Sequence, residues 1–297
     1  MAEAPDPTKP PQESGATRPP IALLIPVHNR LHLLKRALAS VAGERELFDV
    51  ILVDDGSEPP IALEETAGLS IHVIRLDRNV GVSGALNAGL DYIFERGYEY
   101  IARLDSDDAA VHGRFAKQLA FLRQHPDVGL VGSHFEVVSP EGKTLFYSQR
   151  PLENDAIRRG MRIGCMLQTS TVMLRTDVAR QVGPYRTTYR AGEDYDYLWR
   201  CLGRTRVANL PDILMRYEVG APDTLSVSRR LPQALNGLKV RLRYFDPLNA
   251  YSYLGLAMAG LELSNLVRFV QPLKRPLMRA LFGEDSHPVV AGTGKQP

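Results

Sequence analysis

Three aspartates stand together at the end of a short apolar segment, and their spacing is suited to binding a metal ion. Residues 98–104 have the aromatic and aliphatic content of a buried strand, and Asp105, Asp107 and Asp108 follow directly. Carboxylates this close repel one another, so that under partial shielding from water they hold a proton or gather around a cation. Mg²⁺ and Mn²⁺ prefer oxygen ligands, commonly one or two carboxylates together with substrate phosphates. An acidic turn that caps the next helix is an equally good explanation of the cluster alone.

A second acidic strand end precedes this one in the chain. We expect residues 48–53 to form a buried strand that leads into Asp54 and Asp55, which are followed by Gly56 and Ser57. An acid at such a position can accept hydrogen bonds from a base or a ribose, although DDGS is also a common plain turn. Because the carboxyl ends of parallel strands meet at one edge of a sheet, both acidic ends can face one crevice.

The elements that must position these acids alternate between strand and helix. Residues 21–27 form a continuous apolar run of the kind found in a strand buried on both faces, and we expect 48–53 and 70–76 to be the next two strands before the acidic strand at 98–104. Apolar residues at helical spacing follow residues 21–27, and Asn29 is the expected cap of that helix. A glycine-containing segment opens a second helix, which runs to about residue 96. This alternation predicts an α/β fold with a mainly parallel, Rossmann-like sheet and helices on both faces.

The second half of the chain predicts further elements of both kinds. We expect helices at 114–124, 154–162 and 193–202, a hairpin formed by 128–138 and 144–148, and a strand at 169–174. The first turn of the helix at 193–202 is acidic, as the helix dipole favours.

Composition and chain ends indicate an ordinary globular protein. A net charge of +2 over 297 residues gives no reason to expect a nucleic-acid partner, and Cys165 and Cys201 have neither zinc nor disulfide-scaffold spacing. Residues 1–20 are rich in proline without an apolar core, so we expect a disordered tail and no signal peptide, with a reducing, cytoplasmic location.

The pattern changes after residue 230. Residues 231–283 alternate basic-apolar and apolar stretches, and the apolar stretch is too short to span a bilayer, which needs about 20 apolar residues. A helical extension packed on the core is the favoured interpretation, and peripheral contact with the inner face of a membrane is the alternative. We expect residues 284–297 to form a second disordered tail.

Several other kinds of site do not fit the sequence. A dinucleotide-binding Rossmann domain needs glycines in its first turn, where this chain has Pro26, His28, Asn29 and Arg30. The segment VDDGS lacks the second acid of an aspartyl phosphatase, and no nucleophile elbow surrounds a serine.

Five motifs together carry a family resemblance. PVHNR at 26–30, VDDGS at 53–57, RNVGVSGALNAG at 78–89, LDSDD at 104–108 and GED at 192–194 occur in the order seen in family 2 glycosyltransferases with the GT-A fold. The chain resembles that family over residues 21–228, and we expect a catalytic domain at 21–230. The resemblance implies an inverting enzyme that uses Mg²⁺ or Mn²⁺ to move a sugar from a UDP- or dTDP-sugar to a hydroxyl of a glycan or lipid-linked acceptor. Cell-surface polysaccharide synthesis is the expected setting, and a homodimer stays open.

The resemblance also implies roles for individual residues. Asp107 is the preferred metal ligand, Asp105 faces the ribose or a metal-bound water, and Asp194 is the general base with Glu193 beside it. Asp55, or else Asp54, contacts the base. The remaining residues expected at the nucleotide are Pro26, His28, Arg78, Asn79, Gly81 and Asn87.

Two departures from the family pattern bear on the interpretation. Many relatives carry an Arg-x-His motif near the end of the domain, whereas Arg216, Tyr217 and Glu218 stand in the comparable place here. The QxxRW motif of processive synthases is absent, which favours one sugar per encounter. A nucleotidyltransferase that forms sugar nucleotides and a non-catalytic nucleotide-sugar-binding module remain as rival functions. The first normally has a glycine-rich first turn with a basic residue, and the intact acids argue against the second.

Overall fold

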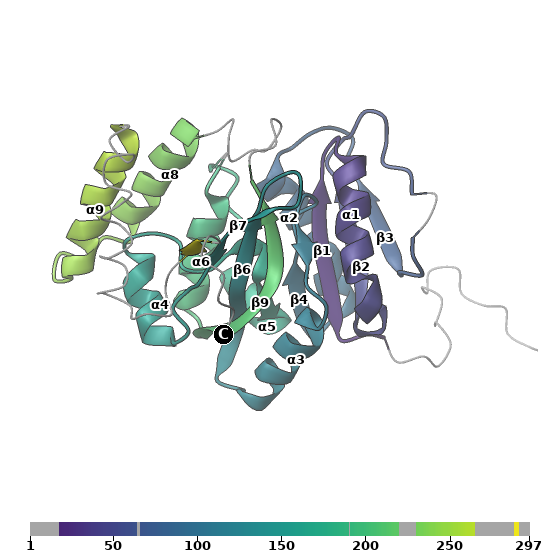
Figure 1. The fold of residues 1–297 in the computed structure, drawn as a ribbon, viewed down its shortest axis with the longest axis horizontal. Coiled ribbons are helices and arrows are strands. Elements are labelled where there is room, and N and C mark those ends of the chain that lie inside the picture. Colours follow the sequence, from purple (N-terminus) through teal and green to yellow (C-terminus); the bar gives the residue numbers. More distant parts are fainter. Residues whose placement is uncertain (1–17, 64–65, 190, 220–229, 265–287, 291–297) are drawn as a thin grey trace, which may run out of the picture.

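A central sheet organises the chain, with helices on both of its faces (Figure 1). The computed structural model describes residues 18–63, 66–189, 191–219, 230–264 and 288–290. Residues 265–283 of the expected extension and almost all of both expected tails therefore lie outside the described residues.

The first half of the sheet is parallel. Its strands are β1 (Ile21–Val27), β2 (Phe48–Asp54), β3 (Ile71–Arg75) and β4 (Tyr100–Arg103), which lie side by side in the order β3-β2-β1-β4. The pairing places Val27 beside Asp54 and Leu24 beside Arg103, so the chain leaves β1, β2 and β4 at the same edge. Strands β1, β2 and β4 are buried because helices cover both faces, whereas β3, at the edge of the sheet, is partly exposed.

The second half of the sheet is mixed. Strand β8 (Met173–Arg175) joins β4 to the hairpin of β6 (Val128–Val138) and β7 (Thr144–Ser148), all with antiparallel pairing. Strand β9 (Arg206–Glu218) runs parallel to β6 and pairs near its end with β5 (Ala109–Ala110). A short strand, β10 (Pro288–Val290), pairs with β7.

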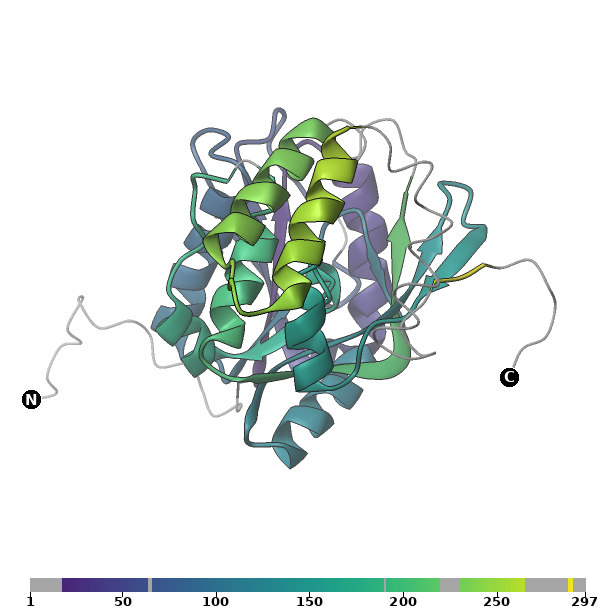
Figure 2. The same cartoon turned by 90° about the vertical axis from the view of Figure 1, so that its left-hand side faces the viewer.

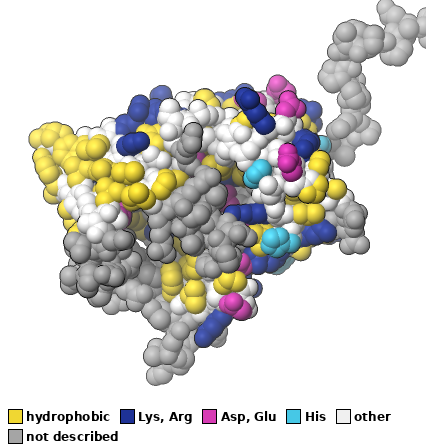
Figure 3. All heavy atoms as spheres, turned by 90° about the horizontal axis from the view of Figure 1, so that it is seen from above, with side chains coloured by type: hydrophobic (Ala, Val, Ile, Leu, Met, Phe, Trp, Pro, Cys, Tyr) yellow, Lys and Arg dark blue, Asp and Glu magenta, His cyan; other side chains and the backbone are white. Residues whose placement is uncertain are grey.

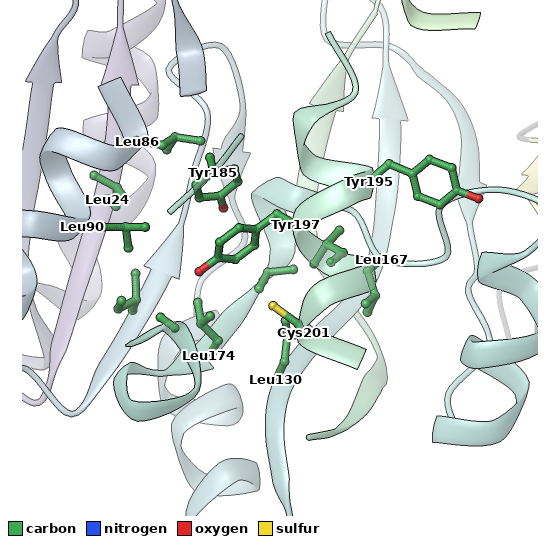
Figure 4. Close-up of a cluster of buried hydrophobic side chains, with 14 of the residues drawn as sticks. Leu24, Leu86, Leu90, Leu130, Leu167, Leu174, Tyr185, Tyr195, Tyr197 and Cys201 are labelled. Carbon is green, nitrogen blue, oxygen red and sulfur yellow. The ribbon is translucent and has the colours of Figure 1, made fainter. Parts of the chain in front are cut away.

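Successive residues of a strand point to opposite faces, and this alternation divides the core into two layers. Ile21 and Leu23 alternate with Ala22 and Leu24 between the layers. One layer holds α1 (Leu31–Val41), η1 (Ala42–Leu47) and α3 (Arg114–Gln124). The other holds α2 (Val82–Arg96), α4 (Asn154–Met161), α5 (Thr176–Val182) and α6 (Glu193–Leu202). Figure 4 shows part of this second layer, where Tyr185 and Tyr197 lie among leucines.

Two helices, α8 (Arg230–Arg243) and α9 (Ala250–Leu263), follow the sheet and lie side by side (Figure 2). Arg162, just after α4, donates hydrogen bonds to the carbonyl of Tyr244 and the hydroxyl of Ser252. Arg241 of α8 donates to the carbonyl of Ile163 at 2.9 Å. The described parts of these two helices therefore contact the preceding domain. Within the described residues, no helix has the length and apolarity needed to cross a bilayer.

Three details differ from the sequence prediction. Asn29 does not cap α1, because it has a φ of 58° and its side-chain oxygen accepts a hydrogen bond from the amide of Glu58 instead. Residues 169–171 form a short 3₁₀ helix, so the expected strand at 169–174 begins only at Met173. Strand β9 was not predicted, and neither were the short elements η1, β5, α5 and β10.

Candidate active site

The carboxyl ends of β1, β2 and β4 open into a cavity of about 470 Å³. The amino end of α6 and the end of β9 close its other sides. The polar and charged residues that line it are His28, Arg30, Asp55, Asn79, Arg103, Asp105, Ser106, Asp107, Gln168, Thr169, Glu193, Asp194, Tyr217, Glu218 and Gln233. Both acidic strand ends and the acidic helix start therefore share one cavity.

The β2 end of the cavity is built around Asp55. Its two carboxylate oxygens accept hydrogen bonds from the amides of Val80, at 2.7 Å, and Gly81, at 3.0 Å. Gly81 has a φ of 82°, which favours glycine, and it directly precedes α2. Asn79 also lines the cavity, and its side-chain oxygen accepts from the same Gly81 amide. The turn after β2 and the start of α2 thus form one fixed wall.

The turn after β1 is tied to this wall. The ring nitrogen Nδ1 of His28 donates to the carbonyl of Asp55 at 2.8 Å, which leaves Nε2 as the other polar atom of the ring. The amide of Asn29 donates to the hydroxyl of Ser57 at 2.9 Å. Pro26 and His28 both line the cavity, so the first turn forms part of its floor as the family resemblance implies.

Asp54 faces away from the cavity and does not support a role in base recognition. Its carboxylate accepts from the amides of Ser57 and Ile61 and forms an ion pair with Arg75 at 2.6 Å, while only 1% of its side chain is exposed. Burial favours the protonated form, but these hydrogen bonds and the Arg75 charge outweigh it and lower the pKa of Asp54. Of the two acids that the sequence left open, Asp55 is the one at the cavity.

Two other expected nucleotide contacts also lie outside the cavity lining. Arg78 is exposed, and its backbone packs closely against Gly56, where an added Cβ would lie 2.5 Å from the Arg78 carbonyl carbon. Asn87 bonds through both ends of its amide with the backbone of Tyr185: its nitrogen donates to the Tyr185 carbonyl, and its oxygen accepts from the Tyr185 amide. Neither Arg78 nor Asn87 therefore lines the cavity.

Asp105 is oriented by its neighbours. One oxygen accepts from Arg103 at 2.8 Å and the other from the hydroxyl of Ser170 at 2.8 Å. Arg103 is only 3% exposed and is itself fixed by a hydrogen bond to the carbonyl of Leu24. The carboxylate of Asp105 is thus held at the cavity wall by groups of the sheet.

Asp107 faces the cavity opposite two arginines. One oxygen of its carboxylate lies 2.9 Å from Arg30, and its carbonyl accepts from Arg36 at 3.0 Å. Burial, and next the charge of Asp105, raise the pKa of Asp107. Arg36 also pairs with Glu218 at 2.5 Å, and Glu218 lines the cavity. The end of β9 thus brings to the cavity a carboxylate that is paired with an arginine.

Asp108, the third acid of the cluster, points into the protein. It is 1% exposed, and neither of its carboxylate oxygens has a hydrogen-bond partner. Burial raises the pKa of Asp108 well above its ordinary value, with the charges of Asp105 and Asp107 adding to the effect. It does not line the cavity, whereas Asp105, Ser106 and Asp107 all do.

Glu193 and Asp194 project from the first turn of α6, directly after Gly192, whose φ is 78°. Asp194 accepts from the hydroxyl of Thr169 at 3.0 Å and from the amide of Tyr195 at 2.7 Å. Burial, followed by the charge of Asp194, raises the pKa of Glu193 to about 8. Burial also raises the pKa of Asp194, although the Thr169 hydrogen bond opposes the shift. Two carboxyls with raised pKa values in a cavity are candidates for proton transfer.

The residues present fit a hard divalent cation. Asp105 and Asp107 offer carboxylate oxygens to an open cavity, which is the donor set that Mg²⁺ or Mn²⁺ uses when substrate phosphates complete its coordination. Among the residues that the structure describes, no three acidic, histidine or cysteine side chains form a ready-made metal site. A cation at Asp107 would accordingly share its coordination with a ligand's oxygens.

The sequence comparison decides the family. The profile described as "Glycosyl transferase family 2" matches residues 22–183, which is more than half of the chain. This chain belongs to the family 2 glycosyltransferases. The matched region contains the cavity residues of β1, β2, α2 and β4, whereas the GED motif lies beyond its end.

Curated relatives agree with this assignment. The Amylovoran biosynthesis glycosyltransferase AmsE of Erwinia amylovora is 31% identical over 178 residues, which cover 58% of this chain and 65% of that protein. An uncharacterized glycosyltransferase of Haemophilus influenzae is 32% identical over 212 residues, covering 69% of this chain and 75% of that protein. The match to AmsE thus extends over slightly less than two thirds of that relative.

Solved structures show the fold. S. aureus TarS 1-349 in complex with UDP-GlcNAc aligns with a TM-score of 0.59 at 16% identity, over 88% of this chain and 75% of that one. The mannosyltransferase PcManGT from Pyrobaculum calidifontis, in complex with GDP-Man and Mn²⁺, aligns with a TM-score of 0.57 over 94% of this chain and 87% of that one, at 16% identity. The expected Rossmann-like GT-A fold is confirmed.

Several cavity residues were not singled out from the sequence. Arg30 and Arg103 stand inside or next to quoted motifs, but nothing in their spacing says that they pair with Asp107 and Asp105. Thr169 comes from a 3₁₀ turn far from Asp194 in the chain, and only the fold brings the two together.

Proposed function

We propose that this family 2 glycosyltransferase transfers one sugar per encounter, with inversion, from a nucleotide-diphosphate donor to a hydroxyl of a glycan or lipid-linked acceptor. The supporting observation is that one cavity contains three groups of residues. Asp55 and Gly81 lie at one wall, Asp105 and Asp107 follow β4, and Asp194 lies at the start of α6. A donor needs all three kinds of group: a nucleoside site, a diphosphate site and a base for the acceptor.

The nucleoside would bind at the wall formed by the turn after β2 and the start of α2. Both oxygens of Asp55 already accept backbone hydrogen bonds, and a carboxylate oxygen can accept a further bond from a base N–H. His28 and Asn79 supply further polar atoms at the same wall. UDP- and dTDP-sugars are the first donors to test, and the GDP-Man complex of PcManGT makes GDP-mannose a third.

The diphosphate would lie near Asp105 and Asp107, which would hold Mg²⁺ or Mn²⁺. Such a cation supplies Lewis-acid stabilisation of the charge that grows on the departing nucleoside diphosphate. Arg103 fixes the orientation of Asp105, and the protein thereby presents its carboxylate without reorganisation.

The acceptor would enter from the side of α6. Asp194 would take the proton of the acceptor hydroxyl as that oxygen attacks the anomeric carbon from the face opposite the leaving group. The hydrogen bonds from Thr169 and from the Tyr195 amide hold its carboxylate in place. Glu193 would act on this carboxylate through its charge, since the two acids are adjacent at the start of α6 and the charge of Asp194 contributes to the raised pKa of Glu193.

A surface on α8 supports a lipid-linked acceptor. Leu231, Leu235 and Leu242 are 60%, 43% and 54% exposed, and the charged residues Lys239 and Arg243 are exposed beside them. Figure 3 shows hydrophobic side chains gathered at the end of the molecule where α8 and α9 lie. Apolar and basic side chains on one helix face suit the surface of an anionic membrane. The relative AmsE, named for amylovoran biosynthesis, supports a role in polysaccharide synthesis.

A donor screen tests the proposal. The full chain is incubated with UDP-, dTDP- and GDP-sugars with and without Mn²⁺, and thermal shift, donor hydrolysis and transfer to added glycans or lipid-linked sugars are measured. We expect one nucleotide class to stabilise the protein, by roughly 2.7 kcal/mol at about 100 times its dissociation constant. Release of pyrophosphate from a sugar phosphate and a nucleoside triphosphate would instead identify a nucleotidyltransferase. Binding without hydrolysis or transfer would identify a non-catalytic binding module.

A further inference from the structure

The charges around the cavity are poorly matched to an anionic donor. Among the residues that the structure describes, six acids line it, whereas the lining lysines and arginines are two, Arg30 and Arg103. The six acids are Asp55, Asp105, Asp107, Glu193, Asp194 and Glu218. A diphosphate that enters this cavity therefore needs a cationic partner that can be released from the acids.

Of these two arginines, Arg30 is the more exposed. Arg103 is 3% exposed, and its guanidinium is bonded to both the Leu24 carbonyl and the Asp105 carboxylate within the sheet. Arg30 is 19% exposed, and its long side chain extends from the turn between β1 and α1. Its guanidinium donates to Asp107 at 2.9 Å.

The guanidinium and a divalent cation compete for the same carboxylate. Two positive charges within a few ångströms of each other repel strongly in a partly buried site. Asp107 is 25% exposed and lines the cavity, so a metal ion held there would meet the carboxylate that bonds Arg30. A metal ion at Asp107 therefore weakens the attraction between this carboxylate and Arg30.

We propose that Arg30 is an internal counter-ion of Asp107 that transfers to the donor diphosphate when Asp107 is engaged by a divalent cation. A guanidinium binds phosphate oxygens through a planar fork of N–H donors, so the donor offers Arg30 a partner as good as the one it loses. Binding of the metal ion frees Arg30 for the diphosphate, and binding of the diphosphate by Arg30 frees Asp107 for the metal ion. The metal ion and the nucleoside diphosphate therefore bind with positive coupling. The inference rests on the proposed function, since that function supplies the diphosphate.

The coupling is measured with ligands that need no turnover. Binding of Mn²⁺ alone is followed by electron paramagnetic resonance, and binding of UDP and of GDP with and without Mn²⁺ by calorimetry. For the wild type we expect weak binding of Mn²⁺ alone and at least tenfold tighter binding when the matching nucleotide is present. In Arg30→Gln, Mn²⁺ alone should bind about tenfold tighter, while the nucleotide with Mn²⁺ should bind at least tenfold more weakly.

Two further variants separate charge from shape. Arg30→Lys keeps the charge that competes with Mn²⁺ but loses the fork, so its affinity for Mn²⁺ alone should stay near wild type while the nucleotide binds more weakly. Arg45→Gln removes an arginine that is 50% exposed and pairs with Glu46 away from the cavity, and both affinities should be unchanged. Comparing this control with Arg30→Gln shows whether the loss of any surface arginine would change the two affinities.

The proposal is overturned if Arg30→Gln binds Mn²⁺ no more tightly than the wild type. If that variant does not fold, Arg30→Lys still decides, because wild-type nucleotide affinity in the presence of Mn²⁺ would refute transfer to the diphosphate. Failure of the proposed function looks different: the wild type would bind neither nucleotide and transfer no sugar, while the Mn²⁺ affinities of the variants could still be compared.

Discussion

Replacing Asp194 by Asn removes a proton acceptor with little change in shape. The carboxylate of Asp194 accepts from the Tyr195 amide through one oxygen and from the Thr169 hydroxyl through the other. An asparagine can keep its carbonyl oxygen on the Tyr195 amide and donate from its nitrogen to the Thr169 oxygen, because a hydroxyl both donates and accepts. The variant should therefore fold normally and keep the side chain in its present position.

The predicted effect is large and confined to turnover. General-base catalysis contributes about 10² to 10⁴-fold, or about 2.7 to 5.4 kcal/mol of activation free energy, so kcat should fall by that factor. Donor binding should change little, since the groups assigned to the nucleoside and the metal, such as Asp55 and Asp107, belong to other elements. Glu193→Gln should reduce kcat less, because Glu193 acts through the charge that it places beside Asp194.

The pH profile gives an independent check. Asp194 must be deprotonated to act, so kcat/KM should rise with pH through the apparent pKa of the Glu193–Asp194 pair, which burial raises above the ordinary carboxyl range. Glu193→Gln removes one negative neighbour and should move this acidic limb to lower pH. The same raised pKa values mean that the folded state binds more protons than the unfolded chain. The pair's contribution to stability is therefore greatest below the ordinary carboxyl pKa and is lost as pH rises toward about 8.

The assay is steady-state transfer with the acceptor found in the screen, with donor affinity measured separately by calorimetry. Thermal melting of each variant shows that any loss of rate does not come from unfolding. Near-normal kcat in Asp194→Asn together with a collapse in Glu193→Gln would exchange the two roles. Near-normal rates in both variants would refute the assignment of the base to α6.

The remaining predictions concern the metal, the core and the α8 surface. Asp107→Asn keeps the shape of the side chain but weakens a charged ligand, so calorimetry should show donor binding that no longer depends on Mn²⁺; tight binding by the wild type in EDTA would contradict a metal role. Gly89→Ala should lower the free energy of unfolding by about 1 to 3 kcal/mol, because the added Cβ would clash with side chains of β1 and β2. Gly260→Ala, where the added Cβ meets open space, should not destabilise the protein, and chemical denaturation measures both variants. Exchanging Leu231 and Leu242 for serine should reduce flotation with anionic vesicles at low salt, where each nearby Lys or Arg contributes about 1 kcal/mol; a wild type that does not float would assign this face to packing or a dimer.

The sequence predicts the parallel half of the sheet well because its buried strands are rich in apolar residues. Strands covered on both faces are rich in apolar residues, as residues 21–27 and 50–53 are, and a polar residue follows each run. Strand β9 was missed because charged and polar residues interrupt its sequence. Without a continuous apolar run, propensity gives only a weak signal for such a strand.

Individual side chains were predicted less well where two neighbours have the same chemistry. Asp54 and Asp55 are identical in type and adjacent, yet successive positions at a strand end point in different directions, so one faces Arg75 and the other the cavity. Asn29 has the right residue type for a helix cap, but the turn after β2 lies close enough to take its side-chain oxygen. In both cases a contact from another part of the chain decides between options that are locally equivalent.

Asn87 shows how a residue of a motif can serve the site without touching a ligand. Its amide pairs with the backbone of Tyr185 in both directions, at 2.9 and 2.7 Å, as one strand pairs with another. The ring of Tyr185 stacks on Tyr197 with centroids 3.8 Å apart (Figure 4), and Tyr197 lies on α6 one turn after Glu193. Helix α2 begins at Gly81, at the wall assigned to the nucleoside, so this chain of contacts links that wall to the helix that carries the acids. Since an inverting transfer needs its base at a fixed distance from the donor, a residue that joins these two elements can be as necessary to the reaction as one that binds the nucleotide.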